Sequence, residues 1–302
     1  MQPFYSHGKL LISAEYAVLD GALALALPTK FGQYLHIEST IENTIIWKSI
    51  SSKGIVWFEA EFKIDATLKI STTNTSEIAV RLVQVLDALQ QLNPLLFEAH
   101  TGYILTSTLE FPENWGLGSS STLINNLAQW AQVDAFKLLE LTFGGSGFDI
   151  ACAQQDSGIL YQLKEGKATV KPVSFSPPFL ESLFFVHRNQ KQNSRDGIAS
   201  YKTLTANQTL DFTSLNHLTL DLLNCTDLKT FESLIEQHER YISSLIQQAP
   251  LKEILFSDYK GAIKSLGAWG GDFFLATGNA EAMAYFKSKG FSTVVPFSEM
   301  IL

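Results

Sequence analysis

The sequence predicts an α+β protein built of two domains. The chain has 302 residues, and globular domains typically hold about 100–200 residues. Runs rich in β-branched and aromatic residues alternate with runs of helical periodicity in both halves of the chain. The segment Ser176-Pro177-Pro178 is the strongest turn signal between the halves. We therefore expect one domain at residues 1–176 and a second at residues 177–302.

The first half reads as strands followed by helices. Short strand-like runs separated by Gly or Ser are expected at residues 10–12, 34–38, 44–48 and 56–62. Residues 77–92 repeat apolar side chains at helical spacing, and Asn93-Pro94 ends that helix. The remaining elements of this half are a strand at 102–111, helices at 121–132 and 135–142, and a hairpin over 158–163 and 168–173.

The second half mixes helices and strands along the chain. The expected strands are residues 183–187, 273–277 and 293–297. The expected helices are residues 194–204, 215–223, 228–248, 251–265 and 280–289.

Charge and composition exclude several classes of protein. Lys and Arg number 22 against 30 Asp and Glu, a net charge of −8, whereas a nucleic-acid surface needs clustered cations. No apolar stretch approaches the ~20 residues of a membrane span, and Glu15 and Asp20 interrupt the run after Lys9 too early for a signal peptide. Cys152 and Cys225 form no metal-binding pair. We expect a cytoplasmic protein without nucleic-acid or membrane partners, either a monomer or a homodimer.

A glycine- and serine-rich turn lies between the strand that ends at Phe111 and the next helix. Gly116 and Gly118 would let the backbone approach a ligand, and Ser119, Ser120 and Ser121 follow at the start of the helix. Unpaired N–H groups and the positive end of the helix dipole favour a phosphate there. A serine hydroxyl there could also ligate Mg²⁺.

Other interpretations of this turn must be weighed against a phosphate site. A Walker-type loop requires a Lys after its last glycine, and none follows here. A dinucleotide fingerprint would have a glycine where Ser121 stands, and would open the first strand–helix unit rather than follow more than 100 residues. A serine that merely caps a helix after a tight turn fits the same letters. The turn alone therefore decides nothing.

Four segments taken together resemble the GHMP kinase superfamily. They are residues 8–21, 112–122, 145–151 and 267–272, in the order that the superfamily has them. The resemblance is closest to the mevalonate and phosphomevalonate kinases, and the first and third segments favour the phosphomevalonate branch. It implies a two-domain α+β fold, with an N-terminal α/β domain that carries the phosphate loop and binds nucleotide and substrate. The C-terminal domain would be ferredoxin-like.

The resemblance also implies a reaction. It is the ATP- and Mg²⁺-dependent transfer of the γ-phosphoryl group to an alcohol or phosphate acceptor, with mevalonate or phosphomevalonate preferred, as in isoprenoid precursor synthesis. The alternatives are a related kinase with a sugar or a homoserine-like acceptor, a decarboxylase of the same superfamily, and a catalytically weak relative that senses a ligand. The form of the 145–149 segment favours a kinase over the decarboxylase.

Two catalytic residues follow from the resemblance. Asp149 matches the aspartate that accepts the acceptor's proton or orients the acceptor. Lys9 matches the N-terminal lysine that would keep Asp149 ionised and stabilise charge on the transferred phosphoryl group. The residues themselves leave a turn aspartate that caps the next helix and an exposed lysine at a strand start as alternatives.

The binding residues implied by the resemblance fall into three groups. For ATP they are Gly116, Leu117, Gly118, Ser119, Ser120, Ser121, Gly270 and Gly271, and for the metal they are Ser120 and Glu140. For the acceptor they are Glu15, Tyr16, Ser146, Gly147, Lys191 and Ser194. Tyr16 could equally be a core residue. The polar segment 187–195 could suit an anionic substrate through three cations, or could be a solvated loop in which Ser194 caps a helix.

The chain departs from the family pattern in two places. Residues 122–148 are a shorter connection between the phosphate loop and Asp149 than relatives carry, and the position of their magnesium-binding acid falls on Leu138. Glu140 is the nearest replacement, and Asp134 is a poorer one. Trp269 stands where the family has a small residue, so we expect it to pack over the phosphate loop or to narrow the nucleotide site.

Overall fold

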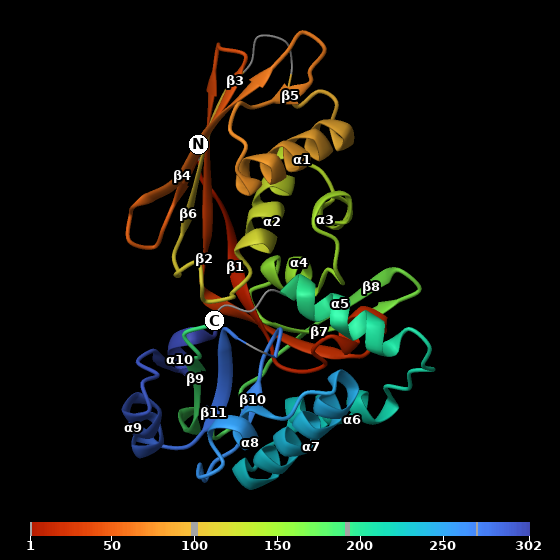
Figure 1. Cartoon of the computed structure of the whole chain (residues 1–302), viewed down its shortest axis with the longest axis vertical. Coiled ribbons are helices and arrows are strands. Elements are labelled where there is room, and N and C mark those ends of the chain that lie inside the picture. Colours follow the sequence, from red (N-terminus) through yellow and green to blue (C-terminus); the bar gives the residue numbers. More distant parts are fainter. Residues whose placement is uncertain (1, 98–101, 191–193, 270) are drawn as a thin grey trace. The chain divides into compact units, whose positions relative to one another are not determined.

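A computed structural model describes residues 2–97, 102–190, 194–269 and 271–302 (Figure 1). Helices and strands occur together throughout, so the predicted α+β class is confirmed. The chain forms two compact units, each assembled from separate segments. Unit 1 comprises Met1–Gly8, Phe31–Glu113 and Gly118–Gln154, and unit 2 comprises Lys9–Lys30, Asn114–Leu117 and Gln155–Leu302. The contiguous domains 1–176 and 177–302 stay a prediction.

The sheet of unit 1 has an alternating inner and outer face. Its strands follow the order β5 (Ile70–Ser71), β4 (Val56–Ile64), β3 (Thr44–Ile50), β6 (Gly102–Leu109) and β2 (Ala24–Thr40). β3 and β6 are parallel, whereas the other neighbours are antiparallel. β1 (Phe4–Leu11) pairs with β2 outside this path. Every second residue of β4 from Phe58 onward is buried, because successive side chains of a strand point to opposite faces.

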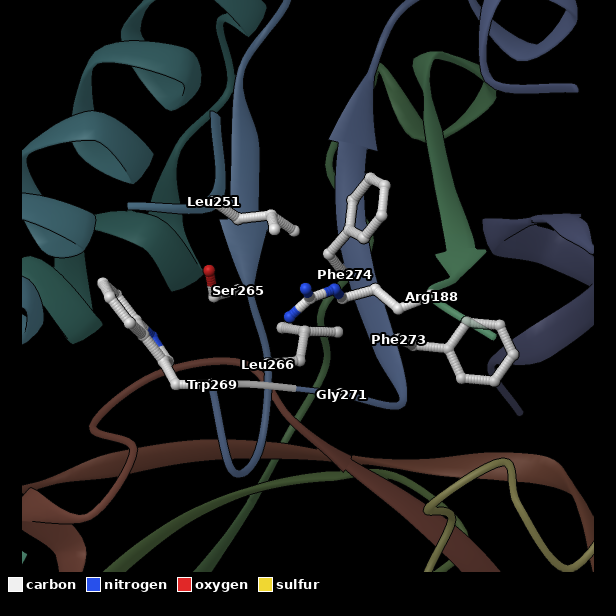
Figure 2. A pocket seen from close by; sticks show the side chains of 8 residues that line it. All are labelled: Arg188, Leu251, Ser265, Leu266, Trp269, Gly271, Phe273 and Phe274. Carbon is white, nitrogen blue, oxygen red and sulfur yellow. The ribbon is translucent and has the colours of Figure 1, made fainter. Parts of the chain in front are cut away.

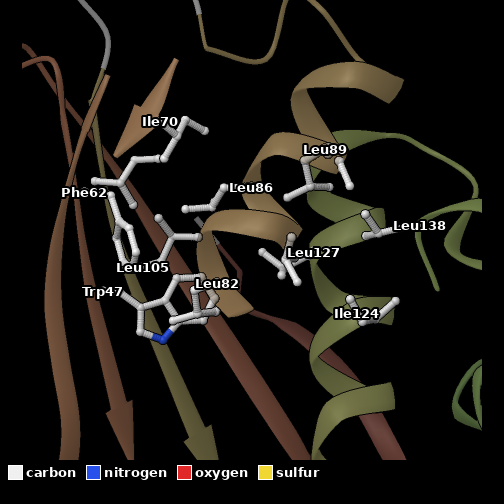
Figure 3. Packing of buried hydrophobic residues seen from close by; sticks show 14 of the residues in the cluster. Trp47, Phe62, Ile70, Leu82, Leu86, Leu89, Leu105, Ile124, Leu127 and Leu138 are labelled. Carbon is white, nitrogen blue, oxygen red and sulfur yellow. The ribbon is translucent and has the colours of Figure 1, made fainter. Parts of the chain in front are cut away.

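Four helices belong to unit 1. They are α1 (Glu77–Leu92), α2 (Ser119–Ala131), α3 (Ala135–Thr142) and α4 (Phe148–Ala153). Figure 3 shows the inner face of α1 against the sheet, with Leu82 and Leu86 beside Trp47 and Phe62, and Leu127 of α2 on the other side of α1. This packed core fixes the directions of α2 and α4, whose first turns carry the predicted site residues.

Unit 2 contains a ferredoxin-like sheet, as predicted. Its order is β10 (Ile263–Ser265), β11 (Phe273–Thr277), β9 (Leu183–His187) and β12 (Val294–Pro296), and all neighbours are antiparallel. In chain order the strands are therefore arranged 2-3-1-4, with helices after the first and third. The predicted hairpin is also present, as β7 (Gly158–Lys164) and β8 (Lys167–Val173), and β7 pairs with the first residues of β2.

Unit 2 also contains helices between the strands of this sheet and after the last of them. They are α5 (Ser194–Thr205), α6 (Thr213–Asn224), α7 (Leu228–Ile246), α8 (Leu251–Leu255), α9 (Ala280–Ser288) and α10 (Phe297–Met300), with short 3₁₀ turns η1 (Ala17–Asp20) and η2 (Leu180–Ser182). Across the residues described, none of the helices combines the length and the apolar character that a membrane crossing requires.

The prediction of a helix over residues 251–265 is correct for the first turn and wrong beyond it. α8 ends at Leu255, and β10 begins at Ile263. Between them Phe256 and Tyr259 enter the core of unit 2, and a Cβ on Gly261 would lie 2.2 Å from the carbonyl oxygen of Thr277. Strand pairing with β11 therefore overrides the helical periodicity of this segment.

Candidate active site

Among the described residues, the first turn of α2 has no side-chain cap. Gly118 precedes it with a φ of 89°, in the left-handed region that favours glycine, and no side chain caps the helix. The alternative of a serine N-cap is therefore wrong, because Ser119 is already the first helical residue. Ser120 is exposed and Ser121 is buried. The first N–H groups of α2 thus have no side-chain acceptor among the residues that the structure describes, which is the arrangement that anion sites at helix N-termini use.

Asp149 lies in the first turn of α4. Gly147, with a φ of 84°, is the residue before that helix, and Asp149 is already its second residue, so the capping role for Asp149 is also wrong. The Ser121 hydroxyl donates a hydrogen bond to Oδ2 of Asp149 at 3.1 Å. Unit 1 therefore brings together one residue of the predicted phosphate loop and the predicted catalytic aspartate. Ser146 and Gly147, both buried, directly precede α4.

Buried amides and hydroxyls hold α2 in place, and no motif in the sequence had marked them. The Asn125 amide donates to Oγ of Ser6 at 2.8 Å, and that hydroxyl donates to Asn126 at 2.7 Å. The Thr122 hydroxyl donates to the side chain of Gln33 at 2.6 Å, and the Asn126 amide donates to the Gln33 carbonyl. These bonds tie α2 to β1 and β2 and so fix the helix start.

Glu140, the predicted metal ligand, lies exposed on the last turn of α3. Asp134 caps that helix by accepting from the N–H groups of Phe136 and Lys137. Among the residues that the structure describes, no three His, Cys, Asp or Glu side chains gather closely enough to hold a metal ion. Mg²⁺ at phosphoryl-transfer sites usually needs only one or two carboxylates, with phosphate and water oxygens completing its shell. The Asp149 carboxylate beside the Ser121 hydroxyl fits that requirement.

In unit 2, Lys9 lies beside the first residues of the phosphate turn. Its backbone N–H donates to the Leu117 carbonyl at 2.9 Å, and Nζ lies 3.4 Å from the Gly116 carbonyl. Gly116 has a φ of 65°, and a Cβ there would lie 2.3 Å from Cγ of Asp272. The late glycine-rich turn therefore contacts the phosphate turn directly through Asp272, a residue that the sequence analysis had not selected for the site.

The late turn departs from ordinary backbone at three positions. Gly267, Trp269 and Asp272 have φ values of 57°, 57° and 56°, so two residues with side chains adopt the left-handed region. Asp272 is held on both sides, because its N–H donates to the Gln190 carbonyl at 2.8 Å and its carbonyl accepts from the Arg188 N–H at 2.7 Å. Gly271 is buried, and Gly270 lies outside the described residues.

Trp269 lines a small pocket of unit 2. Figure 2 shows it with Arg188, whose side chain extends toward Ser265 and Leu266 of the β10 segment. The pocket leaves no room for a water molecule, and the buried indole N–H has no hydrogen-bond partner among the described residues. Burial lowers the pKa of Arg188. One of the three cations expected in the 187–195 segment is therefore half-buried against the late turn.

Of the remaining residues expected to bind the acceptor, the structure describes the side chain of Tyr16 but not those of Lys191 and Ser194. Tyr16 is buried, and its hydroxyl donates to the Ala268 carbonyl at 2.7 Å. Burial, together with the nearby Glu15, raises the pKa of Tyr16 to about 12. Lys191 lies outside the described residues; Ser194 begins α5, and its side chain is not described, so its role as a helix cap stays a prediction.

Glu15 belongs to a buried charge cluster, which we define as Glu15, Lys264, Glu239 and His238. Nζ of Lys264 lies 2.5 Å from Oε1 of Glu15 and 3.2 Å from Oε1 of Glu239. Nε2 of His238 lies 3.7 Å from Oε2 of Glu15. None of the four side chains is more than 4% exposed. Sequence reasoning missed Lys264, although a lone lysine within the apolar run from Ala262 to Leu266 is the signal that could have found it.

Burial sets the protonation of this cluster. It raises the pKa of Glu15 to about 7, against the opposing effect of Lys264, and it also raises the pKa of Glu239. Burial and the Lys264 charge hold the pKa of His238 well below its usual range, so the imidazole is neutral. Its Nε2 accepts a hydrogen bond from the N–H of Ala14 at 3.0 Å, which places the ring proton on Nδ1.

Comparisons with known proteins address the fold. Neither a family model nor a curated protein sequence matches the chain. Solved structures match along almost its whole length. A phosphomevalonate kinase of Streptococcus pneumoniae in complex with phosphomevalonate and AMPPNP has a TM-score of 0.68 and 16% identity, covering 96% of both chains. The mevalonate kinase of L. major with R-mevalonate has a TM-score of 0.66 and 16% identity, covering 97% of this chain and 94% of the other.

A third match widens the range of substrates among these neighbours. The galactokinase of Lactococcus lactis with galactose has a TM-score of 0.66 and 13% identity, covering 95% of this chain and 88% of the other. The chain has the GHMP kinase fold. The resemblance of four short segments thus predicted this fold correctly.

Proposed function

We propose that the chain is an ATP- and Mg²⁺-dependent kinase of small molecules, with mevalonate or phosphomevalonate as the preferred acceptor. The observation that carries this proposal is the start of α2, which has no side-chain cap among the described residues and where Ser121 donates to Asp149 of α4. The fold supports the proposal, because structures that share it were solved with mevalonate, with galactose, and with phosphomevalonate and AMPPNP. The segments at 8–21 and 145–151 favour the phosphomevalonate branch.

The chain's own groups have defined tasks in this proposal. The free N–H groups of the first turn of α2 bind phosphate oxygens, and the left-handed Gly116 and Gly118 let the backbone approach them. Ser120, with Glu140 as the candidate carboxylate, would hold Mg²⁺, which when bound neutralises charge on the phosphates. Lys9 adds positive charge for the transferred phosphoryl group, a role that rests on the resemblance of its segment. Gly271 supports the phosphate turn through its neighbour Asp272, which contacts Gly116.

Asp149 orients the acceptor. Ser121 donates to Oδ2 of Asp149 and so fixes the carboxylate, and the proposal assigns Oδ1 to the acceptor. An alcohol acceptor must lose its proton as the new O–P bond forms, which makes a general base useful. A phosphomonoester has a second pKa of about 6 and is already ionised at neutral pH, so it needs no base. Removing the Asp149 charge should therefore slow an alcohol acceptor more than a phosphate acceptor.

The experiment is a coupled ADP-release screen with mevalonate, phosphomevalonate, homoserine and galactose, with and without Mg²⁺. We expect turnover with mevalonate or phosphomevalonate that requires Mg²⁺. Asp149→Asn should lower kcat by about 10²–10⁴-fold on an alcohol acceptor, with an unchanged melting temperature. Asp221→Asn, an exposed change on α6, is the matched control and should retain full activity. Nucleotide binding without ADP release from any acceptor would contradict the proposed activity.

A further inference from the structure

The loop from Ser13 to Tyr16 has an unfavourable backbone. Ala14 has a φ of 64° and Tyr16 a φ of 60°, both in the left-handed region. Residues with a Cβ avoid this region because the Cβ approaches the following carbonyl oxygen. The conformation therefore persists only where surrounding contacts hold it.

Buried groups from two helices and from β2 supply part of those contacts. Oγ of Ser13 accepts hydrogen bonds from the N–H of Leu25 and from the hydroxyl of Thr219 on α6, both at 2.9 Å. Nε2 of His238 on α7 accepts from the N–H of Ala14 at 3.0 Å. Residues 13 and 14 are thus tied to the interior of unit 2 by their polar atoms.

Lys264 of β10 holds the next residue. Its Nζ donates to Oε1 of Glu15 at 2.5 Å and to the Ser265 carbonyl at 2.6 Å. It also forms an ion pair with Oε1 of Glu239 at 3.2 Å. The Ser265 hydroxyl donates to the other oxygen of Glu239 at 2.8 Å. Glu15 therefore cannot turn away without leaving a buried ammonium group short of an acceptor.

Tyr16 itself is fixed by close packing on α5. Its ring stacks on Tyr201, with the ring centroids 5.7 Å apart, and its hydroxyl reaches the Ala268 carbonyl of the late turn. A Cβ on Gly197 would lie 2.2 Å from the Tyr16 hydroxyl oxygen. Only glycine at position 197 leaves the space that this hydroxyl occupies.

We infer that Lys264 and Gly197 are positioning residues for the proposed reaction: the buried ion pair of Lys264 with Glu15, together with the gap at Gly197, sets Tyr16 against Ala268 as an acceptor-side group. This inference rests on the proposed function and on the acceptor-side role that the resemblance gives Tyr16. A merely structural role does not call for a buried lysine, because apolar side chains of similar volume usually stabilise a core as well or better. What the ion pair supplies is one fixed arrangement of the Glu15-Tyr16 backbone.

The first test reads the placement of Tyr16 without any activity. The protein is labelled with 5-fluorotryptophan, which gives one ¹⁹F signal for each of its five tryptophans, and Trp269→Phe assigns the signal of the residue after Ala268. Gly197→Ala should shift the Trp269 signal, because the new methyl group displaces the Tyr16 hydroxyl from the Ala268 carbonyl. Ser200→Ala, an exposed change on the same helix, is the matched control and should leave the signal in place.

The second test separates positioning from stability. We expect Tyr16→Phe to raise the KM for the acceptor about tenfold, the effect of losing one well-placed hydrogen bond. Lys264→Met alone should raise the KM for the acceptor by a similar factor. Added to Tyr16→Phe, it should raise that KM by less than about twofold, since both changes act on the same group. The KM for ATP should be unchanged in each variant.

The outcomes are distinct. If Lys264→Met does not fold, Gly197→Ala takes its place in the same cycle. Urea unfolding of Gly197→Ala then shows that the variant is folded under the assay conditions, so that a raised KM for the acceptor is not read as unfolding. An unmoved Trp269 signal in the folded Gly197→Ala protein, or equal factors in both backgrounds, would overturn the inference. Absence of phosphoryl transfer from the wild-type protein would instead contradict the proposed function, and the ¹⁹F result would still decide the placement of Tyr16.

Discussion

Gly116→Ala probes the contact between the phosphate turn and the late glycine-rich turn. Two costs add at this position. The first is the left-handed φ of 65°, which disfavours alanine by roughly 1 kcal/mol. The second is steric, because the new Cβ would lie 2.3 Å from Cγ of Asp272 and 2.7 Å from its Cβ, and overpacking of this kind typically costs ~1–3 kcal/mol. We therefore expect a loss of about 2–4 kcal/mol in the free energy of unfolding.

Gly166→Ala is the matched control. Gly166 lies in the same unit and has a φ of 74°, but nothing lies within 4 Å of the position that a Cβ would take. Urea unfolding of both variants followed by circular dichroism isolates the steric part as their difference, which we expect to be about 1–3 kcal/mol. Gly116→Ala should also weaken nucleotide binding, measured by calorimetry, whereas Gly166→Ala should not. Equal losses of stability in the two variants, with unchanged nucleotide affinity, would refute the contact.

Further predictions concern the core, the charge cluster and the metal. Leu127→Ala, which truncates a fully buried side chain of α2, should cost about 2–5 kcal/mol in urea unfolding; a loss below 1 kcal/mol would contradict the packing. His238 has a lowered pKa in the folded state, so its contribution is present above its ordinary pKa of 6.5 and is lost as the pH falls. Between pH 7.5 and 5, the free energy of unfolding of His238→Gln should therefore fall by less than that of the wild type. Glu15, whose pKa is raised to about 7, changes stability in the opposite direction, but it is present in both proteins and its effect cancels in the comparison. Glu140→Gln should raise the Mg²⁺ concentration for half-maximal ADP release about tenfold or more if Glu140 ligates the metal, and an unchanged Mg²⁺ dependence would remove it from the site.

Local patterns in the sequence predicted much of the fold. The helix expected at residues 77–92 is α1 residue for residue, because a Ser76 cap and an unbroken apolar stripe both mark it. Residues 251–265 failed because their apolar spacing suits a helix, whereas pairing with β11 decides the conformation of the last three. That pairing depends on a partner strand outside the segment, which no local window contains.

The candidate site shows the same division. Motif letters located Gly118, Ser121 and Asp149, since glycines and hydroxyls at a helix start have a direct physical meaning. They did not reveal that Ser121 rather than Ser120 bonds to Asp149, because one residue along a helix turns a side chain by about 100°. The partners of Glu15 were hidden for another reason: Glu239 and Lys264 come from distant elements, and only the fold brings them together.

The separation of Glu15 and Lys264 has a consequence for the synthesis of the protein. The two residues are 249 positions apart, and ribosomes add about 5–20 residues per second. Glu15 is thus made roughly ten seconds to nearly a minute before its cation exists. Throughout that interval the strained loop around Ala14 has no Lys264 to close on it, so this part of unit 2 must form late. A chain whose synthesis stops before β10 would contain the whole 8–21 segment but could not form the ion pair between Glu15 and Lys264.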